Sequence, residues 1–386
     1  LEETRTERFL DIATRGKVMP VPIKYYAAHT GRWGGYDKIN LQNLPSRGKN
    51  AKVLKQCLVA PEGYTIIQAD SAQIEARVLA WLAGQDDLVT AFARGEDVYR
   101  QMAAVIYGVA VRDVTDAQRF IGKTVILGAG YGMGATKFRE QLKGYGVVLE
   151  EQECQRIIAA YRSTNYAITQ LWRDAQAALQ GLYCGDEYAL GRSGVLRTIP
   201  DETAIQLPSG LLLRYTDLNA KVEANSMSPE FSYKTREGRV RIYGGKIIEN
   251  VCQGIARCII ADQMLEIAKR YRVLLTVHDS VVCCVKDDEV EVAAGYIDAC
   301  MRYVPDWGKG LPVRGDVEVG PADLAERRVQ GGGLAATGRA EQADVRLGQL
   351  DVVRGDLRVD ALVVIVDGDR EDLLRAVLAH HVLVED

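Results

Sequence analysis

The chain of 386 residues is 47% hydrophobic and 26% charged, a composition typical of a soluble globular protein with room for two or three domains. It contains no run of 18 apolar residues and no apolar signal-peptide core near residue 1, so the sequence predicts neither a membrane span nor a secretory signal. The net charge of −4 leaves a nucleic-acid partner open, because such binding depends on local clusters of basic residues.

The first part of the chain predicts a short amphipathic helix and an extended segment over residues 1–30, followed by loops over 31–60. The apolar run TIIQA (65–69) is then typical of a buried strand. It leads directly into DSAQIEARVLAWLAG (70–84), in which apolar residues recur at helical spacing and a glycine stands past the end. We therefore expect a strand, a tight corner and a helix that stops at Gly84.

Helical patterning dominates residues 96–181. Thr115 and Gln118 have the spacing of a capping box just before a long helix, RFIGKTVILGAGYGM. A second long helix is predicted over 245–272. The runs LLTV and VVCCV after it flank a three-residue polar tip, HDS (278–280), which indicates a hairpin.

The last segment differs in composition from the rest. Residues 321–386 contain 8 Arg, no Lys, no aromatic residue and 13 Asp or Glu, which leaves 40 basic and 39 acidic residues to positions 1–320. We expect a boundary near residue 320. The tail, taken as 326–386, is of unknown nature: a fused module, a disordered segment or a misread frame.

Two aspartates stand where carboxylates are costly unless they are paired. Asp70 lies at a junction of strand and helix, and Asp279 lies at the hairpin tip beside His278. Asp70 alone also fits a helix N-cap, and Asp279 alone fits an ordinary turn. The chain has only four histidines, and its eight cysteines form no CxxC pair, so zinc is not indicated. Two carboxylates with few nitrogen ligands favour magnesium and a phosphate-bearing substrate.

The helix from residue 116 carries a stripe of residues spaced four apart: Arg119, Lys123, Leu127 and Tyr131. On one helix this stripe would be roughly 18 Å long. Arg and Lys can hold a triphosphate, and an aromatic ring can pack against a base. The alternative is a solvated charged face above core-packing residues.

Three segments follow one another in the order of motifs A, B and C of the family A DNA polymerases, and the chain resembles this family. They are DSAQIEAR (70–77), RFIGKTVILGAGYG (119–132) and VHDS (277–280). TGRWGGYDKINLQNLP (30–45) and ENVCQGIAR (249–257) resemble two further elements of the family, and the wording is nearer to its bacteriophage branch. The resemblance covers about residues 1–320.

The resemblance implies an α+β right-hand polymerase fold with an antiparallel palm sheet and helical fingers. It implies palm at 1–95, fingers at 96–200 and palm again at 201–325, with the thumb and the 3′–5′ exonuclease domain absent. The implied activity is DNA-directed DNA synthesis from dNTPs on primer–template DNA, in the cytoplasm of a bacterial host if a phage encodes the chain. A processivity factor, or a separate thumb and exonuclease region, is left open as a partner.

The resemblance also implies roles for single residues. Two Mg²⁺ ions would be held by Asp70 and Asp279, with the backbone carbonyl of Ser71 completing one coordination shell. Contacts with the nucleotide are implied for seven side chains: Gln73, Glu75, Tyr99, Arg119, Lys123, Leu127 and Tyr131. Contacts with DNA are implied for five: Arg32, Gln42, Asn43, Gln253 and His278. Glu75 would exclude a ribose 2′-OH and hydrogen-bond Tyr131, and Tyr99 would replace a phosphate-contacting histidine of bacterial members.

Two positions depart from the family pattern. Ser280 stands where motif C usually has glutamate, so one carboxylate is missing there, and Leu127 stands where an aromatic ring is common in motif B. Two other functions stay open. One is a single-subunit RNA polymerase, which Glu75 and the TGR element disfavour. The other is a catalytically silent DNA-binding fragment, which the intact carboxylate pair disfavours.

Overall fold

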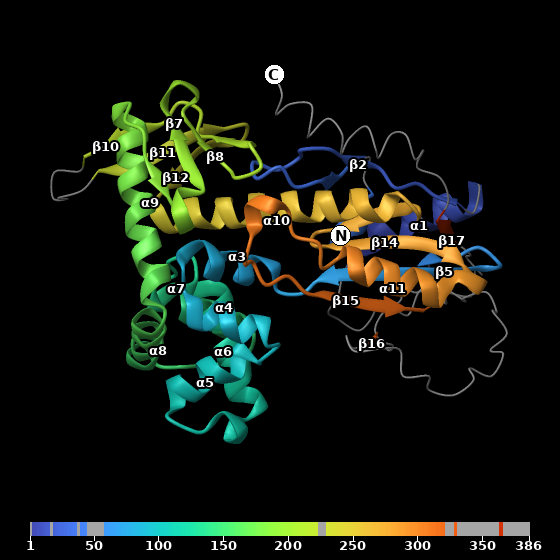
Figure 1. Ribbon diagram of the computed structural model, residues 1–386, viewed down its shortest axis with the longest axis horizontal. Coiled ribbons are helices and arrows are strands. Elements are labelled where there is room, and N and C mark those ends of the chain that lie inside the picture. Colours follow the sequence, from blue (N-terminus) through green and yellow to red (C-terminus); the bar gives the residue numbers. More distant parts are fainter. Residues whose placement is uncertain are drawn as a thin grey trace. The chain divides into compact units, whose positions relative to one another are not determined.

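The structure is a computed structural model that describes residues 2–15, 18–36, 39–44, 58–222, 229–320, 328–329 and 363–365 (Figure 1). The chain divides into two compact units. Unit 1 comprises Leu1–Ala72, Arg257–Tyr303 and Val313–Asp386, and unit 2 comprises Gln73–Ala256 and Val304–Pro312. Among the described residues, no helix combines the length and the apolar character that crossing a membrane would need.

The main sheet of unit 1 has five strands in the order β13–β14–β5–β15–β16, and all neighbours are antiparallel. Their bounds are β5 Tyr64–Ser71, β13 Val273–Val277, β14 Ser280–Lys286, β15 Gly315–Val319 and β16 Arg328–Val329. The central strand β5 thus pairs with segments that follow it by more than 200 residues (Figure 1).

Side chains of β5 alternate between the two faces of this sheet, as the period of a strand requires. Ile67 and Ala69 are fully buried in a core with Val317 of β15, and helix α11 (Val290–Cys300) packs on β5, β14 and β15. Ile66 points to the opposite face, into a second core, and Asp70 follows it on that face four residues later. The alternation therefore directs Asp70 away from the α11 side.

The N-terminal part of unit 1 contributes to that second core through Phe9, Met19 and Leu41. Its elements are α1 Glu2–Arg15, β1 Val18–Met19, β2 Ile23–Lys24, β3 Gly34–Gly35, η1 Leu41–Asn43 and β4 Leu58–Val59. Strands β2 and β3 form a short antiparallel pair. A small parallel sheet has the order β1–β17–β4, with β17 at Val363–Ile365. The 3-10 helix η5 (Asp287–Glu289) links β14 to α11.

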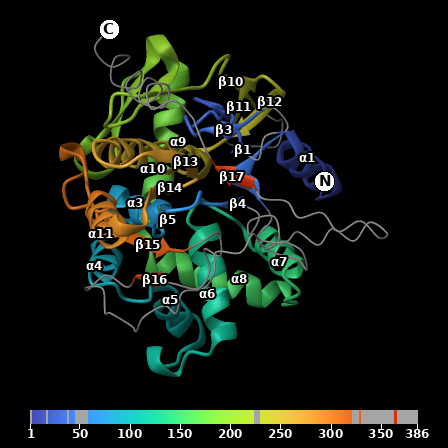
Figure 2. The ribbon, with the colours of Figure 1, turned by 90° about the vertical axis from the view of Figure 1, so that its right-hand side faces the viewer.

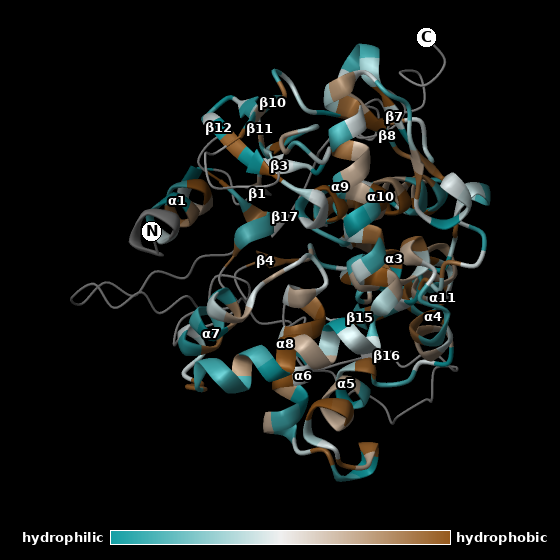
Figure 3. Ribbon diagram, turned by 90° about the vertical axis from the view of Figure 1, so that its left-hand side faces the viewer, coloured by the Kyte–Doolittle hydropathy of each residue, from teal (hydrophilic) through white to brown (hydrophobic). Residues whose placement is uncertain are grey.

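Unit 2 is mainly helical. Its helices are α3 Ile74–Ala83, α4 Asp86–Ala93, α5 Val98–Tyr107, α6 Asp116–Ala129, α7 Ala135–Gly144, α8 Glu151–Thr164 and α9 Tyr166–Cys184. Helices α5, α6 and α8 lie side by side around one apolar core that includes Phe92, Phe138 and Tyr161 (Figure 2). Helix α9 shows hydrophobic and hydrophilic residues in alternation along its length, as a helix with one buried face should (Figure 3).

Two small antiparallel sheets complete unit 2, with the orders β6–β7–β8–β9 and β10–β11–β12. Their strands are β6 Ala189–Leu190, β7 Leu196–Ile199, β8 Ala204–Gln206, β9 Leu212–Arg214, β10 Asn219–Lys221, β11 Glu230–Thr235 and β12 Gly238–Ile242. Four 3-10 helices are η2 Val111–Asp113, η3 Arg192–Gly194, η4 Pro200–Glu202 and η6 Asp306–Gly308. Helix α10 (Gly244–Ala268) follows, and the boundary between the two units falls within it.

Several local predictions are confirmed. Gly84 ends α3 in the left-handed conformation, and Thr115 and Gln118 form both hydrogen bonds of the capping box. The predicted helix over 245–272 is α10, and the predicted hairpin is β13–β14.

Two details of the sequence prediction are wrong. The hairpin tip has two residues, His278 and Asp279, because Ser280 is already paired with Asp70 in the sheet. Helix α6 ends at Ala129, so Tyr131 lies in the turn that follows it and does not extend the stripe of Arg119, Lys123 and Leu127. Residues 326–327, 330–362 and 366–386 of the predicted tail lie outside the described part.

Candidate active site

The two motif aspartates lie on neighbouring strands of unit 1. Asp70 is the second-last residue of β5 and is half-buried, and Asp279 is the second residue of the β13–β14 turn. The backbone N–H of Ser71 donates to the carbonyl of Asp279 at 2.9 Å, and Ser280 lies directly across from Asp70. Asp70 is therefore inside a strand, three residues before the N-cap of α3, and is not a helix cap.

The turn that carries Asp279 has an unusual backbone. His278 is exposed and adopts the left-handed conformation with φ 54°, which is uncommon for a residue other than glycine. The Asp279 carboxylate accepts a hydrogen bond from Arg32 at 3.0 Å, in an ion pair whose two side chains are about one-fifth exposed. The structure thus brings together four residues that the resemblance implied: Arg32, Asp70, His278 and Asp279.

Sequence reasoning missed the residue that anchors Arg32. Arg257, on the unit 1 part of α10, is 1% exposed and donates from Nε to the carbonyl of Gly31 at 3.0 Å. Its guanidinium stacks on the rings of Trp33 and Tyr25, at 4.6 Å and 5.2 Å from the ring centres. A buried cation on two aromatic faces is a strong constraint. It holds the loop on both sides of Arg32.

The donor set of this pair suits magnesium, because Asp70, Asp279 and the Ser71 backbone all supply oxygen. In the part of the chain that the structure describes, no group of three His, Cys, Asp or Glu side chains is close enough to enclose a metal ion. Magnesium normally keeps several waters and uses one or two carboxylates together with substrate phosphates. The residues present fit such an open site.

A cationic cluster in unit 2 gathers four of the implied nucleotide-binding residues. The Arg119 guanidinium and the Lys123 ammonium lie 5.4 Å and 5.9 Å from the centre of the Tyr99 ring. The Gln73 side chain hydrogen-bonds the Tyr99 hydroxyl, and burial, offset in part by that bond, raises the pKa of Tyr99. A Cβ at Gly122 would lie 2.2 Å from the Tyr99 carbonyl, so glycine permits the close contact of α5 and α6.

Asp97 orients Arg119, and sequence reasoning did not single it out. Its carboxylate caps α5 by accepting from the backbone N–H groups of Tyr99 and Arg100, and it accepts from Arg119 Nε at 2.7 Å. Burial alone would raise the pKa of Asp97, but these hydrogen bonds and the charge of Arg119 outweigh it and lower the pKa. The capping position of Asp97 was visible in the sequence, whereas its contact with Arg119 was not.

We predict a pH-dependent effect of Asp97→Asn on stability. Because folding lowers the pKa of Asp97, its ionised form stabilises the protein above the unfolded-state pKa, and this contribution is lost as pH falls through the folded-state pKa. Asp97→Asn should therefore lower the melting temperature at neutral pH, and the difference should shrink below about pH 3.9. Asp113→Asn, at an exposed carboxylate 3.8 Å from Arg112, is the matched control. A difference independent of pH would contradict the assignment.

Glu75 and Tyr131 are close enough to interact, but hydrogen bonding here differs from the expectation. Tyr131 hydrogen-bonds the thiol of Cys252, which is fully buried in α10. Burial, then the charges of Cys252 and Glu75, raises the pKa of Tyr131 well above its usual value. Tyr131 is therefore a neutral hydroxyl at physiological pH. The predicted hydrogen bond between Glu75 and Tyr131 stays a prediction.

The remaining implied residues are placed as follows. Leu127 is 43% exposed on α6, and Gln253 is half-buried on α10. Asn43 is exposed at the end of η1. Gln42 is 8% exposed, and its amide donates to the carbonyl of Thr276 at 2.9 Å, which ties η1 to β13. A supporting role for Gln42 follows directly from these contacts.

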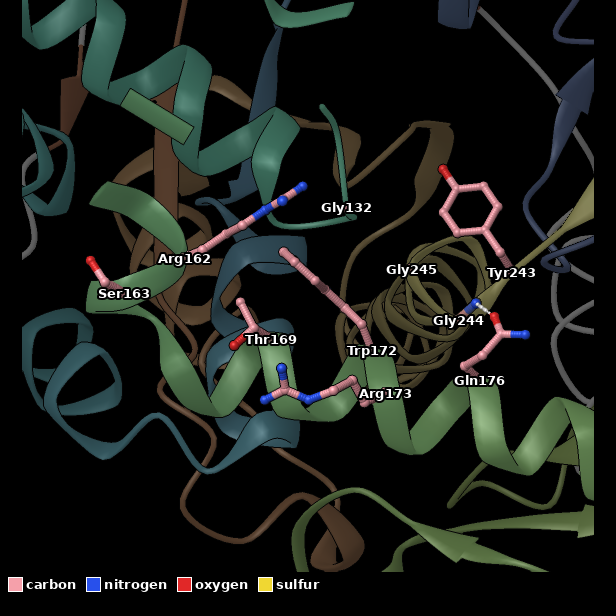
Figure 4. Close-up of a pocket in the computed structure, with 10 residues that line it drawn as sticks. All are labelled: Gly132, Arg162, Ser163, Thr169, Trp172, Arg173, Gln176, Tyr243, Gly244 and Gly245. Carbon is pink, nitrogen blue, oxygen red and sulfur yellow. Dashed lines mark hydrogen bonds between the residues drawn. The ribbon is translucent and has the colours of Figure 1, made fainter. Parts of the chain in front are cut away.

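Unit 2 also contains a pocket that sequence reasoning missed (Figure 4). It has a volume of about 570 Å³ and is lined by Gly132, Arg162, Ser163, Thr169, Trp172, Arg173, Gln176, Tyr243, Gly244 and Gly245. The Trp172 indole donates to the carbonyl of Gly130 at 2.8 Å, and the Arg162 guanidinium lies 6.0 Å from the centre of the Trp172 ring system. Gln176 accepts from the N–H of Gly244 at 2.8 Å. The lining combines cations with aromatic rings.

The fold is that of a polymerase domain. A solved structure titled the POL domain of Pol1 from M. smegmatis in complex with DNA primer-template and dNTP is similar, with a TM-score of 0.59 and 21% identity over 83% of this chain and 51% of that chain. Residues 1–324 match DNA polymerase family A, and the chain belongs to that family.

Two curated relatives agree with this membership. The DNA polymerase of Bacillus phage SP02 is 29% identical over 339 residues, which cover 76% of this chain and 50% of the relative. DNA polymerase I of Pseudomonas aeruginosa is 36% identical over 192 residues, which cover 47% of this chain and 20% of the relative. The chain thus spans half or less of the length of these relatives.

Proposed function

We propose that this chain is a DNA-directed DNA polymerase that adds dNTPs to the 3′-OH of a primer paired with a DNA template. The observation that carries the proposal is the combination of two carboxylates on adjacent strand ends, Asp70 and Asp279, with a cationic cluster around Tyr99, in a member of DNA polymerase family A. Residues of the palm and fingers type would lie at 1–95 with 201–325, and at 96–200, respectively.

Asp70, Asp279 and the Ser71 carbonyl would hold two Mg²⁺ ions. When bound, such ions activate the attacking hydroxyl and stabilise the leaving phosphate in an in-line displacement. Arg32 would keep the Asp279 carboxylate in place until DNA and nucleotide are present, because the two side chains are already ion-paired.

Arg119 and Lys123 would hold the triphosphate of the incoming nucleotide. The fork of Arg119 is oriented by Asp97 on one side and the Tyr99 ring on the other, so it needs little reorganisation on binding. Gln73, through its hydrogen bond to Tyr99, supports the same cluster. Leu127, exposed on the same helix, would contact the sugar or base.

Glu75 would discriminate against ribonucleotides by crowding the 2′-OH, in a position fixed by the first turn of α3. We predict that Glu75→Ala raises the ratio of ribonucleotide to deoxynucleotide incorporation, because the smaller side chain leaves space for the hydroxyl. Single-nucleotide insertion with matched dNTP and rNTP measures this ratio. Glu96→Ala, in the same unit, is the control, and an unchanged ratio in Glu75→Ala would remove Glu75 from this role.

Arg32, His278 and Gln253 would contact the minor groove near the primer end, where acceptors common to all correct pairs report pair shape rather than sequence. Asn43, exposed at the end of η1, would contact the duplex directly. Gln42 would act there through the position of η1, because its amide is engaged with Thr276.

The pocket between Gly132 and Trp172 has the chemistry of a single-strand site, since cations and stacking rings together bind unpaired bases. We predict that the exposed pair Arg162→Ala/Arg173→Ala weakens binding of primer–templates with a long 5′ overhang but not of blunt duplex. The salt dependence of binding should fall by about 0.7 per lost phosphate contact on a single strand. Exposed Arg112→Ala is the control. Equal weakening on both DNAs would contradict this assignment.

Primer extension on a defined template with Mg²⁺, using dNTPs and rNTPs in parallel, tests the proposed function. We expect template-directed extension with dNTPs. A preference for rNTPs would favour an RNA polymerase, and binding without extension by either nucleotide set would favour a silent DNA-binding protein.

A further inference from the structure

Asp70 has a neighbour on each side in the sheet of unit 1. On β14 the residue directly across is Ser280, and on β15 it is Asp316. Residues directly opposite each other in an antiparallel pair project to the same face, with Cβ atoms about 4.5–5.5 Å apart. The Ser280 hydroxyl indeed donates to the Asp70 carboxylate.

The face on which Asp316 lies is fixed by its neighbour in sequence. Val317 is 1% exposed and pairs with Ala69, and both belong to the core on the α11 side of the sheet. Because successive strand residues alternate, Asp316 lies on the other face, together with Asp70. Sequence reasoning could not reach this pairing, since Asp316 follows Asp70 by 246 positions.

Asp316 has no structural task that would explain a carboxylate there. It is half-buried, and within the described residues its side chain has no hydrogen bond or ion pair. Two uncompensated carboxylates on facing strand positions repel each other and are destabilising unless a cation lies near them. Ser280, on the other side of Asp70, brings no charge.

We propose that Asp316 is a third carboxylate of the divalent-cation site at Asp70, and that it acts by accepting hydrogen bonds from the waters of the cation held there. This deepens the proposed function and rests on it. Contact through water agrees with the absence, among the described residues, of any three carboxylates gathered around one point, and magnesium retains such waters. Asp316 then contributes from β15 the negative charge that β14 lacks at Ser280.

The test is Mn²⁺ binding to the full chain, followed by the electron paramagnetic resonance signal of free Mn²⁺, together with a thermal melt of each variant. Removal of a group that orients a metal's surroundings typically costs 10–100-fold in affinity. We expect Asp316→Asn, which keeps the size and removes the charge, to raise the Mn²⁺ Kd at least about tenfold. Glu318→Gln is the matched control, since Glu318 is on the same strand and face but lies across from Gln68. It should leave the Kd within about twofold.

A second variant tests the reason for the effect. Ser280→Glu placed in the Asp316→Asn chain restores a carboxylate beside Asp70 from the other strand, and should recover most of the lost Mn²⁺ affinity. An Asp316→Asn chain that folds and binds Mn²⁺ like the parent would overturn the proposal, as would equal losses in Asp316→Asn and Glu318→Gln.

Asp70→Asn separates this inference from the proposed function. If Asp70→Asn lowers Mn²⁺ affinity and Asp316→Asn does not, only the role of Asp316 fails. If Asp70→Asn also leaves binding unchanged, the metal site of the proposed function itself is wrong.

Discussion

Asp70→Asn and Asp279→Asn should each lower the single-turnover rate of primer extension by about 10³-fold or more. Each substitution keeps the shape of the side chain and removes one of the two charges that would hold the catalytic ions. A loss of this size corresponds to about 4 kcal/mol of transition-state stabilisation. Binding of primer–template should remain within a few-fold of the parent, because neither carboxylate would be needed to hold DNA.

The control for both variants is Asp298→Asn, at a carboxylate of the same unit that is paired with Arg302 at 2.9 Å. It should extend primers like the parent. If Asp70→Asn or Asp279→Asn retained more than a few per cent of the parent rate while folded, the two-metal assignment would have to be abandoned.

The second large effect is expected at Lys123. Lys123→Met keeps the apolar stem and removes the ammonium group that lies over the Tyr99 ring, so a triphosphate would lose one cationic partner. Removal of one group that stabilises charge in a transition state commonly costs about 10²–10³-fold in rate. Pre-steady-state insertion of a single dNTP, over a range of concentrations, separates weaker nucleotide binding from slower chemistry.

Lys143→Met, at an exposed lysine near the end of α7, is the matched control and should insert nucleotides normally. A Lys123→Met enzyme with unchanged rate and unchanged apparent nucleotide affinity would show that the cationic cluster faces something other than the triphosphate. In that case α6 would carry only a solvated charged face.

Features governed by a few neighbouring residues were predictable from the sequence. The capping box of Thr115 and Gln118, the left-handed glycine that ends α3 and the β13–β14 hairpin depend on contacts within a few positions, and all three are confirmed. The exact ends of elements were less predictable. Helix α6 stops before Tyr131, within a stretch where Gly128, Gly130 and Gly132 weaken helical order.

Partners distant in sequence could not be predicted. The pairing of Asp316 with Asp70 and the stacking of Arg257 on Trp33 depend on strand register and helix docking, which no local pattern encodes. The sheets β6–β9 and β10–β12 were also missed, because short strands with mixed burial give little periodic signal. Motif order grouped the candidate residues correctly, whereas the residues that support them came only from the structure.

The central position of β5 has a consequence for how the protein is made. Asp70 pairs with residues 280 and 316, so its sheet cannot form until more than 200 further residues have left the ribosome. At about 5–20 residues per second, this delay is roughly 10–40 s. During that time β5, with its fully buried Ile67 and Ala69, has no strand partner, whereas the helices of unit 2 close mostly local contacts and can fold first. Chaperone demand during synthesis should therefore centre on β5, and it should end when β14 and β15 emerge.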